Sequence, residues 1–272
     1  MPAPTAISTD KLARLIGTPK CPALIDVRLD EDVAADPRLI PSAIRRPATD
    51  ARRWAAEFAG QQAIVVCQRG LKLSQGAAAW LRQEGVAAEV LEGGHEAWSA
   101  AALTLVPEAM LPPRDERGRT VWVTRARPKV DRLACPWLIR RFLDPRAVFL
   151  FVAPSEELAV AERFGATPFD LEDVFWSHRN EHCTFDTMVE EFALDLEPLR
   201  RLAVIVRGAD TARLDLAPES AGLLAASLGL SRMYSDDLEQ LEAAMLVYDA
   251  FYRWCRDAVD EPHSWPARKP GA

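Results

Sequence analysis

The sequence lacks any long apolar run, since no stretch approaches the roughly 20 residues that a membrane-spanning helix needs. Its first ten residues contain neither a basic cluster nor an apolar core, so they do not resemble a secretory signal. The 272 residues hold only five cysteines, an odd number without paired spacing, which does not suit a disulfide framework. We therefore expect a cytoplasmic protein that has no membrane partner.

Positive charge is not in excess in either half of the chain. The formal net charge is −7; residues 1–110 hold 12 Lys and Arg against 13 Asp and Glu, and the remainder holds 21 against 27. Nucleic-acid-binding domains usually concentrate basic residues, so we expect no nucleic-acid partner. The sequence also lacks the Gly-x-Gly-x-x-Gly motif, the Walker loop and the Gly-x-Ser-x-Gly turn.

What remains is the composition of a globular protein long enough for two domains, with 49% hydrophobic and 27% charged residues. Over residues 1–106, short apolar segments alternate with amphipathic ones, which predicts a parallel sheet covered by helices. Residues 107–119 hold three prolines and a charged cluster, and indicate a linker. Residues 120–259 predict a second, helix-rich α/β domain, whereas residues 260–272 have little to bury and are expected to be disordered.

Hydrophobic periodicity and capping signals place the elements of the second domain. Strands are predicted at 120–124, 147–152 and around 175–177, and helices at 184–193, 197–207, 218–229 and 236–258.

The octet Cys67-Gln68-Arg69-Gly70-Leu71-Lys72-Leu73-Ser74 is the strongest candidate site. It lies between the apolar run 63–66 and a helix-like stretch, so a buried strand would turn tightly into a helix. In such a turn the backbone N–H groups and the helix N-terminus point at the sulfur and lower its pKa. Arg69 and Lys72 add positive charge, and no carboxylate is near them in the sequence. This pattern favours a thiolate at Cys67, or an anionic group attached to its sulfur.

Three segments in order resemble the landmarks of the rhodanese family of sulfurtransferases. Asp26-Val27-Arg28 stands where the family carries Asp-x-Arg, the octet matches the active-site loop, and Gly93-Gly94-His95-Glu96-Ala97-Trp98 matches a closing Gly-Gly-x-x-x-Trp segment. The resemblance covers about residues 5–105. It implies a thiosulfate sulfurtransferase in which Cys67 takes a sulfane sulfur from a small-molecule donor. The sulfur is held as a persulfide and passed to a thiophilic acceptor, and no cofactor is required.

The resemblance also implies roles for the neighbours of Cys67. Arg69, Lys72 and the backbone N–H of Gly70 would stabilise the negative charge, and Arg28 would be a further cation behind them. One departure from the family pattern is that the hydroxyl expected after the basic residue comes one place later, at Ser74. The segment 39–44 also lacks the family's histidine.

Two other interpretations of the octet need to be considered. Cysteine phosphatases require Cys-x5-Arg, because the guanidinium clamps a tetrahedral oxyanion. Here Leu73 occupies the arginine position, which excludes that chemistry. The second interpretation is a rhodanese module that binds a ligand at Cys67 without reacting.

The second half resembles the C-terminal domain of the chromate-resistance regulatory protein family over roughly residues 120–257. The matching segments are 129–142, 183–186, 205–211 and 248–252. DNA-regulatory members of that family carry a different N-terminal region, so the resemblance does not extend DNA binding to this chain. It implies a domain related to chromate or oxidative stress, with chromate or another oxyanion as a candidate partner.

A candidate metal site lies at His178-Arg179-Asn180-Glu181-His182-Cys183. These residues, with Asp186 and the distant Asp210, could supply a mixed N, O and S ligand set for zinc or iron. The spacing matches no closed structural zinc motif, so His178, Cys183 and Asp210 are the favoured ligands of a site with open positions. The alternative is a polar loop in which Cys183 or Thr184 caps the next helix.

Cys135 has two interpretations. Because it precedes Pro136, it could be a helix N-cap thiol with a lowered pKa that receives sulfur from the Cys67 persulfide. Otherwise it is a small buried residue beside Trp137.

The leading hypothesis is therefore a sulfurtransferase that carries a persulfide on Cys67 and is joined to a chromate-resistance-type domain. The main alternative is a non-enzymatic oxyanion or metal sensor, in which Cys67 binds or is oxidised without turnover. A third hypothesis is reduction of chromate by the thiols.

Overall fold

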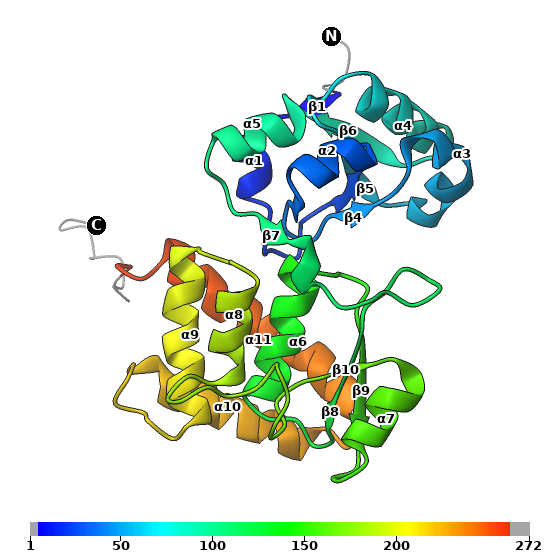
Figure 1. The fold of residues 1–272 in the computed structure, drawn as a ribbon. Helices are drawn as coiled ribbons and strands as arrows, with labels where there is room; N and C mark the ends of the chain where they lie inside the picture. The colour runs from blue at the N-terminus through cyan, green and yellow to red at the C-terminus, as the bar shows by residue number, and fades with distance from the viewer. Residues whose placement is uncertain (1–4, 262–272) are drawn as a thin grey trace, which may run out of the picture.

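The computed structural model describes residues 5–261, in which two parallel sheets each carry their own group of helices (Figure 1). This arrangement confirms the predicted α/β class, with a helix-covered parallel sheet followed by a helix-rich unit. No helix within the described residues has the length and apolarity needed to cross a membrane.

The first sheet has five parallel strands in the order β1-β6-β5-β2-β4. Its strands are β1 (Ala6–Ile7), β2 (Ala23–Asp26), β4 (Ile44–Arg45), β5 (Gln62–Val66) and β6 (Ala87–Leu91). The helices of this unit are α1 (Thr9–Ala13), α2 (Asp30–Ala35), α3 (Ala51–Trp54), α4 (Lys72–Gln83) and α5 (Gly94–Ala100). A short antiparallel pair, β3 (Arg38–Leu39) with β7 (Val106–Pro107), ties the end of this region back to its middle.

Alternate residues of the central strand β5 enter different cores, as expected for a strand buried on both faces. Ala63 and Val65 pack with α3 and α4 in one cluster. Ile64 and Val66 face a second cluster that contains Trp98 of α5. Cys67 follows directly at the carboxyl end of this strand, where the ligands of parallel sheets bind.

The second unit combines a three-stranded parallel sheet, in the order β10-β8-β9, with six helices. The strands are β8 (Val121–Arg125), β9 (Val148–Val152) and β10 (Thr167–Pro168). The helices are α6 (Asp131–Phe142), α7 (Glu157–Phe164), α8 (Thr184–Glu191), α9 (Glu197–Asp210), α10 (Glu219–Met233) and α11 (Asp237–Asp257). The strand predicted around residues 175–177 is reduced to a single bridge between Phe169 and Trp176. Trp176 is instead stacked on Phe192, with ring centroids 4.5 Å apart.

The two units share one apolar core. The second cluster of the first sheet continues into Phe142 of α6 and Tyr252 of α11. At Gly17, whose φ is +76°, an added Cβ would lie 2.3 Å from the Phe142 ring, so only glycine allows this approach. The backbone N–H of Ser42 also donates to the Phe142 carbonyl at 2.6 Å.

Residues 107–119, predicted as a linker, contact both units: Pro107 pairs with Arg38 of β3, and the later part of the segment packs against the second unit. Arg114 forms a bridge with Thr120 and an ion pair of 3.1 Å with the buried Asp144. The tail predicted at residues 260–272 lies outside the described residues from residue 262 onward.

Candidate functional site

The Cys67 thiol lies in a turn between β5 and α4 and is only 4% exposed. Its Sγ atom is 3.2 Å from the Ser74 hydroxyl, and the backbone N–H groups of Arg69, Leu71 and Ser74 also point at it. Burial by itself would raise the pKa of the Cys67 thiol, but these hydrogen bonds outweigh burial, so the pKa is lowered. The turn is therefore arranged to hold a thiolate.

Ser74 reaches the sulfur because it lies in the first turn of α4. A helix places its third residue back over its own N-terminus, and the Ser74 hydroxyl is also 3.1 Å from the Leu71 carbonyl. The hydroxyl that comes one place late in the sequence thus contacts Cys67. It was not among the residues predicted to stabilise the charge.

The Gly93-Gly94 segment supports the thiol turn from behind. The backbone N–H groups of His95 and Glu96, at the start of α5, donate to the carbonyls of Cys67 and Gln68 at 3.0 Å each. Gly94 has φ +59°, and a Cβ there would lie 2.2 Å from the Cys67 carbonyl oxygen. The glycine is required because two backbone segments touch at this point.

Gly70 meets the same segment from the other side. Its φ is +70°, and a Cβ would lie 2.5 Å from the Leu91 carbonyl oxygen. Gly70 is thus needed for the shape of the turn. The N–H groups that contact the sulfur belong to its neighbours Arg69 and Leu71 and to Ser74.

No carboxylate lies near Arg69 in the sequence, but the fold brings one to it. The Arg69 guanidinium is exposed and forms an ion pair of 3.1 Å with Glu96, which lies 27 residues later in α5. Lys72 is also exposed, at the first position of α4. The main groups that lower the pKa of Cys67 are the hydroxyl and the backbone N–H groups.

Arg28 is buried and binds its own loop. It pairs with Asp26 at 2.8 Å and donates to the carbonyls of Asp36 at 3.0 Å and Arg38 at 2.8 Å. These contacts use the Asp-x-Arg motif to fix the segment that follows β2. Arg28 therefore positions the rim of the site.

A pocket of about 430 Å³ opens beside the Cys67 turn, at the carboxyl ends of β2 and β4. Its lining includes Arg28, Arg45, Arg46 and Leu73. Arg45 pairs with the exposed Asp30 at 2.7 Å, whereas its Nε atom is buried and has no partner among the described residues. Asp30 also lines this pocket and Arg46 pairs with Glu57 at 3.0 Å, so the pocket combines three arginines with carboxylate partners, and the Arg45 Nε is its free donor among the described residues.

The hydrogen bonds at Cys67 lead to a first prediction. Ser74→Ala should raise the pKa of Cys67, because it removes the hydroxyl donor to the thiolate. The rate of alkylation by iodoacetamide should then shift to higher pH. Arg69→Gln is the control, because it removes a cation already paired with Glu96, and the profile should stay nearly unchanged. A shift in the Arg69 variant without one in the Ser74 variant would assign the stabilisation to charge instead.

In the second unit, His178 lies among three carboxylates from separate segments. Its Nε2 atom is 3.2 Å from Asp210 at the end of α9, 3.3 Å from Asp170 after β10, and 3.6 Å from Asp131 at the start of α6. Hydrogen bonds to Asp170 and Asp210 raise the pKa of His178 to about 10. Burial, followed by repulsion from Asp210 and Asp170, raises the pKa of Asp131 well above its ordinary value.

The structure thus brings together His178 and Asp210 but adds two residues that the sequence prediction missed. One ligand atom each from Asp131, Asp170 and His178 lie within 4.8 Å of one another. The sequence offers one reason to consider Asp131 as a site residue, since it lies in a segment that resembles a known family. It offers no such reason for Asp170, because only the fold brings that residue to His178.

The Cys183 thiol is not one of the three ligand atoms that lie within 4.8 Å of one another, although it hydrogen-bonds the Asp131 carboxyl. It is the N-cap residue of α8, and its backbone N–H donates to Asp186 at 3.0 Å, which is the capping alternative considered above. The thiol is fully buried, and burial raises its pKa far above the ordinary value. His182 is also separate, paired through its backbone with Arg179.

The prediction that Cys135 is a helix N-cap thiol is wrong. Helix α6 already begins at Asp131, so Pro136 lies inside it and Cys135 precedes the proline within the helix. Cys135 is fully buried, and burial raises its pKa well above the ordinary value. It is therefore unsuited to attack a persulfide on Cys67.

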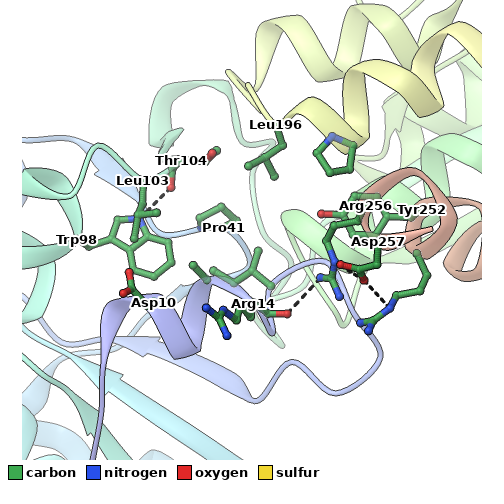
Figure 2. Close-up of a pocket in the computed structure, with 14 residues that line it drawn as sticks. Asp10, Arg14, Pro41, Trp98, Leu103, Thr104, Leu196, Tyr252, Arg256 and Asp257 are labelled. Atoms are coloured by element: carbon green, nitrogen blue, oxygen red, sulfur yellow. Dashed lines mark hydrogen bonds and ion pairs between the residues drawn. The ribbon is translucent and has the colours of Figure 1, made fainter. Parts of the chain in front are cut away.

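A cavity of about 830 Å³ lies where the two units meet (Figure 2). Arg14 and Trp98 line it from the first unit, and Tyr252 and Arg256 from the second. Arg256 also donates to the Arg14 carbonyl at 3.2 Å. The described lining residues include neither Cys67 nor the residues around His178, so this cavity is separate from both sites.

Comparison with known proteins supports both resemblances seen in the sequence. Residues 8–101 match the rhodanese-like domain family, and residues 122–255 match the family described as ChrB, C-terminal domain. Protein ChrB of Cupriavidus metallidurans is 31% identical over 141 residues, which are 52% of this chain and 42% of that protein. The chain thus spans less than half the length of this relative.

Three solved structures are similar to part of this chain. A rhodanese-related protein from Thermoplasma volcanium is 24% identical, with 38% of this chain and 98% of that chain covered and a TM-score of 0.33. A rhodanese-like domain protein from Staphylococcus aureus is 29% identical, with coverages of 35% and 90% and a TM-score of 0.32. A thiosulfate sulfurtransferase from Pseudomonas aeruginosa is 25% identical, with coverages of 40% and 21% and a TM-score of 0.33.

Proposed function

We propose that this chain is a sulfurtransferase with a persulfide on Cys67, because residues 8–101 match the rhodanese-like domain family and residues 122–255 match the family described as ChrB, C-terminal domain. We propose further that its second domain links this activity to chromate resistance. The observation that carries the sulfurtransferase proposal is the Cys67 thiol, whose pKa is lowered by hydrogen bonds at the end of a buried strand.

The proposed reaction has two steps. The Cys67 thiolate attacks the outer sulfur of thiosulfate, an S–S bond forms at Cys67, and sulfite leaves with the electron pair of the bond that breaks. A thiophilic acceptor such as cyanide then takes the outer sulfur and releases the thiolate. The N–H groups that point at Sγ stabilise its negative charge before the first step and after the second.

The pocket beside the turn supports an anionic donor. Arg45 and Arg46 line it, and Leu73 connects it to the first turn of α4, one residue before Ser74. A dianion such as thiosulfate would be attracted to this edge of the sheet by charge.

The proposal is tested with the purified full chain. After incubation with thiosulfate, the peptide that contains Cys67 should gain the mass of one sulfur atom, and addition of cyanide should release thiocyanate. Absence of both products would reject the sulfurtransferase proposal.

The second candidate function is a non-enzymatic sensor of an oxyanion or metal. The observation that favours the metal version of this alternative is the group of three carboxylates around His178, which the sulfur-transfer reaction does not use. Under this alternative, Cys67 would bind or be oxidised without forming thiocyanate.

A further inference from the structure

Four side chains of the second unit converge on one point although they are far apart in the chain. Asp131, Asp170 and Asp210 surround the Nε2 atom of His178 at 3.6, 3.3 and 3.2 Å, respectively. They come from the start of α6, the loop after β10 and the end of α9, while His178 lies in the loop before α8. Carboxylates repel one another, so such a group needs a positive charge at its centre.

One carboxylate oxygen in this group has no partner. Asp131 is fully buried, and its Oδ2 atom accepts from the backbone N–H groups of Thr184 at 2.6 Å and Phe185 at 3.3 Å. Its Oδ1 atom is buried and meets no N–H or O–H donor among the residues that the structure describes; the Cys183 thiol is a weak donor beside this carboxyl. An unpaired buried carboxylate oxygen is costly, so this atom indicates a missing cationic partner.

The surrounding contacts hold the carboxylates in position. Arg132 donates to Asp170 Oδ2 at 2.9 Å, and the Thr184 hydroxyl donates to Asp170 Oδ1 at 2.8 Å. The backbone N–H of Asp131 approaches Asp210 Oδ1 at 3.4 Å. Metal-binding carboxylates are commonly oriented by outer hydrogen bonds of this kind.

The group also has an entrance. The His178 side chain is 41% exposed, whereas Asp131 forms the buried floor. An ion could therefore enter from the His178 side and meet the Asp131 carboxylate below, whose Oδ2 atom is 3.6 Å from His178 Nε2.

We propose that Asp131, Asp170, Asp210 and His178 bind one divalent cation of the first transition row, such as Mn²⁺, Fe²⁺ or Zn²⁺. Three carboxylates and one imidazole suit these cations, whereas a soft cation would prefer thiolates. This site replaces the predicted set of His178, Cys183 and Asp210, because the Cys183 thiol is fully buried and is not among the ligand atoms that lie within 4.8 Å of one another. It is independent of the proposed sulfur transfer at Cys67.

The rival arrangement is an ion cluster in which a proton on His178 replaces the metal. To separate the two, the full chain is stripped with a chelator, dialysed against ZnCl₂ or MnCl₂ alone, and freed of excess metal. Metal content is then measured by mass spectrometry. We expect one bound ion per chain, with Zn²⁺ retained more tightly than Mn²⁺.

Two variants and a matched control test the ligands. His178→Gln and Asp131→Asn should each lower the affinity by more than the roughly 10- to 100-fold that loss of an outer contact costs. Asp173→Asn removes a carboxylate from an exposed position in the same loop as Asp170, and it should bind like the unaltered chain. The His178 change should leave the chain folded because that side chain is 41% exposed, and circular dichroism checks this.

Two outcomes would overturn the proposal. One is an unaltered chain that takes up neither ion after stripping, and the other is equal uptake by the two ligand variants and the control. The donor set is tested separately by loading the unaltered chain with Co²⁺. Oxygen and nitrogen ligands give no thiolate-to-cobalt charge-transfer band in the near ultraviolet; a band that Cys183→Ser removes would show that the ligand set includes the thiol.

Discussion

Cys67→Ser is expected to abolish both persulfide formation from thiosulfate and release of thiocyanate. A serine hydroxyl is not ionised at neutral pH and cannot form a persulfide, so the loss should be complete within the limits of the assay. The change in size is small, so the free energy of unfolding should fall by only about 1 kcal/mol. The mass of the peptide that spans residue 67 and the thiocyanate yield measure the two effects.

The matched control for this change is Cys255→Ser. Cys255 is also buried, in α11, but burial raises its pKa to about 11. Its replacement should leave sulfur transfer intact. If Cys67→Ser still forms thiocyanate at the rate of the unaltered chain, Cys67 is not the nucleophile.

Gly94→Ala is expected to have the second-largest effect. The Cβ atom would lie 2.2 Å from the Cys67 carbonyl oxygen and 2.5 Å from the Gly70 nitrogen, both backbone atoms that cannot rotate away. The positive φ costs about 1–2 kcal/mol, and the forced displacement adds roughly 1–3 kcal/mol. Because the displaced backbone carries Cys67 and Arg69, sulfur transfer should also be lost.

Gly85→Ala separates backbone strain from the clash. Gly85 has a similar φ of +76°, but nothing lies within 4 Å of its added Cβ. The Gly85→Ala variant should therefore be less stable by only about 1–2 kcal/mol, from conformational strain, and should keep its sulfur-transfer activity. The stabilities of the two variants are compared by the urea concentration at half unfolding. An equal loss of stability in both would show that Gly94 does not make a tight contact with the Cys67 turn.

The thiol site could be predicted from sequence because its parts lie close together in the chain. Cys67 and Ser74 belong to one strand–turn–helix segment, and the apolar run before it fixes where the strand ends. The ion pair between Arg69 and Glu96 could not be predicted in this way, because a separate helix brings the carboxylate to the turn. The sequence therefore shows the two cations near Cys67, but it does not show the Glu96 carboxylate that the fold adds to them.

The group around His178 shows the same limit more strongly. Asp170 and Asp210 reach His178 only after three separate segments have packed together. Cys183 was favoured as a ligand because it is close in sequence, yet the start of α8 uses its backbone as a cap. Pro136 misled the prediction for a different reason. Proline favours the first turn of a helix, but here it lies inside α6.

The apolar core that runs from Trp98 to Phe142 and Tyr252 has a consequence for synthesis of the chain. The first unit leaves the ribosome well before α11, whose residues complete that core, has been made. Until then, the part of the first unit around Gly17 lacks the Phe142 and Tyr252 rings that contact it in the finished protein. Newly made chains therefore pass through a stage in which this part is open to chaperones or to other chains.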